Sequence, residues 1–65
     1  MRLIKMILSE TTEYGGEFIK QITEPLYIPR IGETVIVKHR HKTVYNVITN
    51  YVGDVVEVSV LVRDP

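Results

Sequence analysis

The sequence predicts a small all-β domain, a barrel of five antiparallel strands, from its residue usage, its turn spacing and its length. Ten Val, eight Ile, six Thr, four Tyr and one Phe account for 29 of the 65 residues, and these types favour strands. Alanine is absent and only four leucines occur, so strong helix formers are scarce. A chain of 65 residues allows one domain, which we place over residues 1–65.

Turn residues divide the chain into strands. The predicted strands cover residues 2–13, 17–23, 34–38, 43–52 and 55–63. Gly15-Gly16 supplies the positive φ of a tight hairpin turn between the first two strands, and Gly53-Asp54 fits a type II′ turn between the last two. Residues 24–33 contain two prolines, which do not fit a paired central strand, so this segment is predicted to be a loop.

The last hairpin is clear enough for its register to be derived. If Val52 pairs with Val55 across the two-residue turn, alternation gives the two strands one apolar face, which we expect to be the core. The residues predicted on this core face are Tyr45, Val47, Tyr51, Val56, Val58, Val60 and Val62. The opposite face mixes apolar and polar residues, so we expect the N-terminal hairpin, the 24–33 loop or a second copy of the chain to cover part of it.

Two surfaces are candidates for binding a protein partner, including a second copy in a homo-oligomer. One is the loop at residues 26–31, because aromatic, aliphatic and Arg side chains are typical of interaction hot spots. The same residues could instead plug the open end of a barrel. The other surface is the mixed second face of the last hairpin. The candidate interface residues are Tyr27, Arg30, Val44, Ile48, Val55 and Leu61.

Five consecutive basic or imidazole side chains, Lys38, His39, Arg40, His41 and Lys42, lie between the third and fourth predicted strands. Lys and Arg neutralise phosphates, so this tip is a candidate site for nucleic acid, a nucleotide or another anion. The alternative, which the neutral net charge favours, is a solubilising tip that keeps edge strands apart. The net charge of zero and the pI of about 6.7 argue against a dedicated nucleic-acid-binding protein.

Catalytic and metal chemistry find little support. His39 and His41 would start a metal site, but a closed zinc site takes four ligands, and the chain has no Cys and no further His. Ser9 and Ser59 have no base nearby in the sequence to activate them. A barrel this small also has little concave volume from which to exclude water. We therefore predict a non-enzymatic protein with no metal site and no cofactor.

The N-terminal segment of residues 1–8 has the apolar character of a leader. Lys5 interrupts its apolar run and no small-residue cleavage site follows, so a strand is predicted instead. No apolar run approaches the roughly 20 residues of a membrane helix. We expect a cytoplasmic protein that does not associate with membranes.

The stretch Ile28-Pro29-Arg30-Ile31-Gly32-Glu33-Thr34-Val35, followed by a Val-rich hairpin, resembles the core of SH3-like β-barrels. It is similar to stretches in small uncharacterised bacterial and bacteriophage proteins of that type, over residues 28–63. The resemblance implies a five-stranded SH3-like barrel. The resemblance is also compatible with a phage-type inhibitor or accessory protein, but it implies no catalytic or binding residue.

Overall fold

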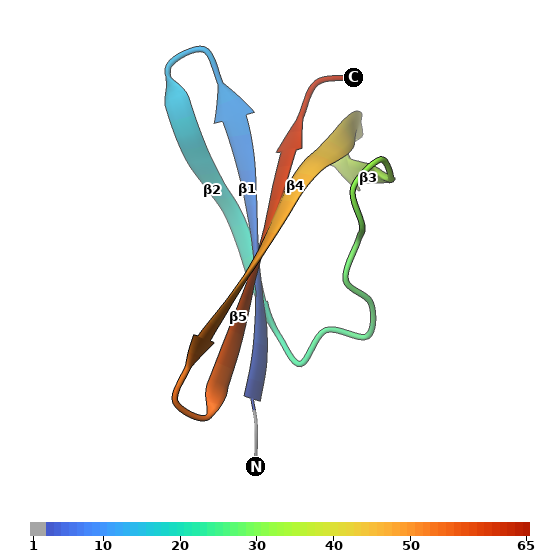
Figure 1. The fold of residues 1–65 in the computed structure, drawn as a ribbon. Coiled ribbons are helices and arrows are strands. Elements are labelled where there is room, and N and C mark those ends of the chain that lie inside the picture. The colour runs from blue at the N-terminus through green and yellow to red at the C-terminus, as the bar shows by residue number, and fades with distance from the viewer. Residues whose placement is uncertain (1–2) are drawn as a thin grey trace.

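The computed structural model describes residues 3–65 and forms one curled, open β-sheet (Figure 1). Its strands are β1 (Leu3–Thr12), β2 (Gly15–Thr23), β3 (Thr34–Val37), β4 (Arg40–Val52) and β5 (Val55–Arg63). They lie in the order β2-β1-β5-β4-β3, so β2 and β3 are the edges. The predicted all-β class with five strands is confirmed. The predicted first strand begins at residue 2, which lies outside the described residues.

The sheet is mixed, which corrects the prediction of a purely antiparallel barrel. β1 runs parallel to β5, with pairs from Leu3↔Val55 to Glu10↔Val62, while the other neighbouring pairs are antiparallel. The antiparallel prediction assumed that each connection is a hairpin. The segment 24–33 instead joins the two edge strands, and this long crossover permits a parallel pair at the centre.

The core lies on the concave face of the sheet. Its buried apolar side chains are Met6, Leu8, Val44, Val58, Val60 and Val62. Partly buried side chains from the surrounding strands and the loop pack against them: Ile4, Ile19, Ile22, Ile28, Val35, Val37, Val47 and Val56. The predicted core face of β5 is confirmed by this list. Tyr51, predicted to be part of the core, is 71% exposed, because it lies near the end of the β4–β5 hairpin, beyond the packed region.

The β4–β5 register follows the prediction from Val52↔Val55 as far as Asn46↔Leu61 and then shifts by one residue. A bulge at Tyr45 makes Val44 the partner of Val62, so Val44 faces the core and is only 1% exposed. Tyr45 turns to the convex face. There its hydroxyl group is hydrogen-bonded to that of Thr11, and the Arg63 guanidinium lies 5.0 Å from the centre of its ring.

Candidate protein-binding surface

The segment 24–33 is anchored to the sheet at both of its ends. Glu24 has a positive φ of 53°, its N–H donates to the carbonyl of Ile4 (2.7 Å), and its carboxylate accepts from the Ile4 N–H (3.1 Å). At the other end Gly32 N–H donates to Val44 O, and Val44 N–H donates to Glu33 O, both at 2.9 Å. The loop between these anchors is therefore held at fixed points on β1 and β4.

Large apolar side chains of the loop face solvent. Leu26 is fully exposed, Tyr27 is 60% exposed and Ile31 is 64% exposed, whereas Ile28 packs on the core. With Val47 of β4 the loop borders an open hollow of about 680 Å³. Its lining residues are Pro25, Leu26, Tyr27, Ile28, Pro29, Arg30, Ile31 and Val47. A hollow that is mainly apolar, with Arg30 among its lining residues, is suited to recognising another protein.

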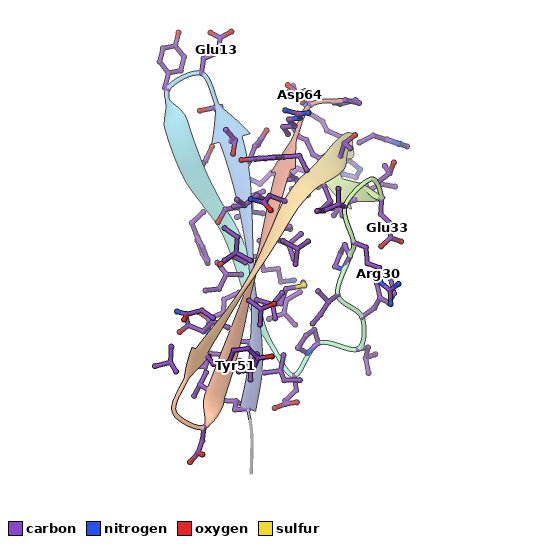
Figure 2. All side chains as sticks on the ribbon, in the orientation of Figure 1. Glu13, Arg30, Glu33, Tyr51 and Asp64 are labelled. Atoms are coloured by element: carbon purple, nitrogen blue, oxygen red, sulfur yellow. The ribbon has the colours of Figure 1, made fainter. Side chains whose placement is uncertain are left out.

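Glu33 organises this loop. Its carboxylate accepts the Tyr27 hydroxyl through both oxygens, at 2.7 and 2.8 Å, and the backbone N–H of Arg30 at 2.6 Å. The Arg30 N–H and the Tyr27 hydroxyl lower the pKa of Glu33, and the hydrogen bond to this carboxylate raises the pKa of Tyr27. Figure 2 shows the Arg30 side chain extending away from the sheet, which leaves its guanidinium accessible.

The six predicted interface residues do not form one surface. Tyr27 and Arg30 line the hollow. Val44 was expected on the second face and is instead part of the core, because the bulge at Tyr45 reverses its side. The other three are on the convex face: Ile48 is 49% exposed, while Val55 and Leu61 are partly buried. Strand alternation there places them among polar residues, so that face is less continuous than the loop surface.

The basic segment forms the tight β3–β4 hairpin. Val37 pairs with Arg40, so the turn consists of Lys38 and His39 alone, and β4 begins three residues earlier than predicted. Both turn residues have positive φ, 49° and 68°, as a type I′ turn requires. Lys38, His39, Arg40 and His41 are exposed.

Lys42 differs from the rest of the basic segment, which corrects its place in the predicted anion site. It points inward, is 5% exposed, and its ammonium lies 2.5 Å from carboxylate oxygens of both Glu10 and Asp64. These hydrogen bonds raise the pKa of Lys42 and lower that of Asp64. An ammonium already paired with two carboxylates has little capacity for an incoming phosphate. The residues of the predicted anion site that remain available are Lys38, His39, Arg40 and His41.

His39 lies in the β3–β4 turn and His41 on β4, so the alternation of a single strand does not place their side chains on one face. Within residues 3–65 no three His, Asp or Glu side chains gather into a group that could hold a metal ion. The same part of the chain contains no helix of the length and apolarity needed to cross a membrane.

Sequence reasoning identified the loop from its composition but missed two of its features. The role of Glu33 had a weak signal, a carboxylate three residues after Arg30 at the entry to a strand. No signal in the sequence indicated that Val47 lines the hollow, because the tertiary fold brings it beside the loop. Comparison with known proteins finds no match: no family model fits the chain, and no curated protein or solved structure is significantly similar to it.

Proposed function

We propose that this chain is a small non-enzymatic module that binds a partner protein through the loop surface at residues 25–31 and also associates with itself. The observation that carries this proposal is the exposure of Leu26, Tyr27 and Ile31 beside a hollow, on a loop anchored at both ends. A domain of 65 residues depends strongly on its apolar contacts. Three large apolar side chains left in solvent on an ordered segment therefore favour a binding role over a purely structural one.

The geometry also indicates what the partner presents. The hollow accepts an apolar side chain, and the accessible guanidinium of Arg30 favours a carboxylate next to it. The Tyr27–Glu33 hydrogen bonds restrict the aromatic ring before binding, which lowers the entropic cost of ordering it in a complex. The partner is thus proposed to contribute an apolar anchor with an acidic neighbour.

Two isoleucines with the same 64% exposure make a matched test. Ile31 lies in the loop, and Ile36 lies on β3, outside the hollow lining. In affinity capture followed by mass spectrometry, Ile31→Ser should lose a protein that both the wild type and Ile36→Ser retain. Equal capture by the two variants would show that the loop does not bind the partner.

Anion binding at the basic hairpin is the second candidate function. The observation that favours it is the left-handed conformation of both Lys38 and His39. Asn and Gly adopt this conformation with less strain than Lys and His do. Strain retained at an exposed basic turn is expected where the side chains themselves are used. Fluorescence anisotropy with a short single-stranded oligonucleotide should show binding that weakens steeply with salt and is lost in Lys38→Ser/Arg40→Ser. Salt-insensitive binding, or none, would refute this candidate.

The finer parts of the identity are proposals as well. We propose a distant SH3-like origin, which is compatible with the curled all-β sheet although the parallel β1–β5 pair departs from the expected antiparallel barrel. A cytoplasmic inhibitor or accessory protein of phage type would suit a module that offers a binding loop. An experimental structure of the bound complex would test both the fold relationship and the role.

A further inference from the structure

The two halves of β4 differ in their sheet environment. Residues 40–43 pair with β3, Thr43 and Val44 also pair with β5, and Gly32 and Glu33 continue the bonding on the β3 side as far as Val44. From Asn46 to Val52 β4 pairs with β5 alone. No other strand of the described chain lies against this part of β4, which is therefore an exposed sheet edge (Figure 1).

The hairpin geometry determines which backbone groups point out from this edge. A two-residue turn makes Val52 and Val55 a hydrogen-bonded pair, and the antiparallel pattern alternates from there. The N–H and C=O groups of Val47, Thr49 and Tyr51 are consequently directed away from β5. Within residues 3–65 the only hydrogen bond made by them is from Val47 N–H to the Asn46 side-chain oxygen, at 3.0 Å.

The edge at residues 46–52 lacks the features by which proteins protect edge strands. It contains no charged residue, no proline and no glycine, and its Val, Ile, Thr and Tyr residues favour strands. The other edges are protected: β2 carries Glu17 and Lys20, and β3 has only four residues and ends at the basic turn. Residues 46–52 carry no charge, so they do not themselves repel the same residues of a second copy.

We propose that a second copy of the chain pairs with this edge, antiparallel about a two-fold axis through Thr49. In this register Thr49 lies opposite Thr49 of the second copy and Val47 lies opposite its Tyr51. All three outward-facing residues then form hydrogen-bonded pairs, which gives about six backbone hydrogen bonds once the Val47 N–H exchanges the Asn46 side-chain oxygen for the second copy. A register centred one residue away pairs fewer of these groups. The inference rests on the self-association in the proposed function and identifies its surface.

The pairing also completes the loop surface. Val47 and Tyr51 both follow the alternation of the concave face, and Val47 lines the hollow. The ring of Tyr51, 71% exposed in a single copy, would lie against Val47 of the second copy and extend the wall of that hollow. An edge contact alone buries little area, and these exposed rings supply apolar burial on the same side. The dimer therefore has two enlarged binding hollows.

Thr49→Pro tests the pairing, with Thr49→Val as its matched control. Proline removes an N–H that makes no bond to any other residue of the described range 3–65, and proline is tolerated on an edge strand at such a position. By multi-angle light scattering the wild type and Thr49→Val should have twice the 7.5 kDa of one chain, and Thr49→Pro should have the single mass. Its dimer dissociation constant should rise by roughly a hundredfold or more.

The outcomes separate this inference from the proposed function. A wild type that is monomeric at every concentration overturns the pairing and the proposed self-association together, and leaves the partner test on Ile31 to stand by itself. A Thr49→Pro protein that remains dimeric overturns the edge pairing alone. If circular dichroism shows Thr49→Pro to be unfolded, Thr49→Lys replaces it. Two ammonium groups then face each other at the axis, so dissociation at low salt and reassociation at high salt support the pairing, and a salt-independent dimer refutes it.

Discussion

Val44→Ala tests the bulge that distinguishes the observed β4 from a regular strand. With the bulge at Tyr45, Val44 pairs with Val62 and is 1% exposed. In an unbroken register Val44 would lie on the convex face, and truncating it there would cost little. The stability of this single variant therefore reports which side of the sheet the residue occupies.

The expected magnitude follows from the burial of the side chain. Val44→Ala removes two buried methyl groups, which costs about 1.6 kcal/mol at about 0.8 kcal/mol each. The cavity left behind raises the total to about 2–3 kcal/mol. A domain of this length has a free energy of unfolding of about 3–10 kcal/mol, so the loss is a large fraction of its stability. The melting temperature should fall by at least about 8 °C.

Urea unfolding followed by circular dichroism measures this loss, and Val52→Ala is the control. Val52 belongs to the same strand, so its truncation lowers strand preference equally, but it is 51% exposed and should cost under about 1 kcal/mol. If the two variants lose the same stability at one protein concentration, Val44 does not lie in the core and the bulge is wrong.

Three further predictions concern the ion pair, the loop and the basic turn. The Lys42 ammonium holds the pKa of Asp64 below its ordinary value, so the stability it provides is present at neutral pH and is lost as the pH falls below about 4. When the free energy of unfolding is measured as the pH is lowered, Asp64→Asn should not show the decrease that the Asp64–Lys42 pair causes in the wild type. Glu33→Gln removes the charged acceptor that holds the loop, and hydrogen exchange of the loop amides should become faster while exchange in the β5 core stays unchanged. Lys38→Asn/His39→Gly relieves two left-handed residues and should raise the free energy of unfolding by about 1 kcal/mol in urea titration; no gain would mean that the turn is unstrained.

The parts of the fold that follow from the sequence are those determined by neighbouring residues. The two-residue turn at Gly53-Asp54 predicts the β4–β5 register correctly over seven pairs. Once the turn fixes the first pair, strand alternation determines the following pairs. The parallel β1–β5 pair could not be obtained in this way. It depends on the path of the 24–33 crossover between the two edges, which is a property of the whole chain.

The bulge shows how one residue changes a correct local pattern. Alternation from Val52 predicts that Tyr45 faces the core and Val44 faces away, and nothing in the local sequence contradicts it. The structure reverses both, and Tyr45 obtains contacts with Thr11 and Arg63 that no spacing within the hairpin could reveal. The inward direction of Lys42 could not be predicted from its neighbours in the sequence either. It is explained by the ion pair with Glu10, which the fold places beside it on β1.

The candidate site was more accessible to sequence reasoning than the register of the strand beside it. Exposed apolar side chains on a loop with two prolines depend on composition and local backbone restriction, and both can be read from the chain. The loop's anchors at Ile4 and Val44 depend on tertiary contacts, so they could not be predicted from the sequence. Composition thus indicated the candidate loop, and the fold shows which contacts hold this loop in place.

The balance of buried and exposed apolar side chains links the two proposed surfaces. Six apolar residues of the described chain are buried, while nine large ones are exposed. Three of the nine, Leu26, Tyr27 and Ile31, lie on the loop, and three more, Ile48, Tyr51 and Val52, lie on the free half of β4. Of the three on β4, Tyr51 shares the face of Val47, which lines the hollow together with the loop, whereas Ile48 and Val52 lie on the convex face. Edge pairing places Tyr51 of one copy beside the loop of the other, so self-association and partner binding become successive uses of one apolar region. Losing the dimer should then weaken partner binding even when every loop residue is intact.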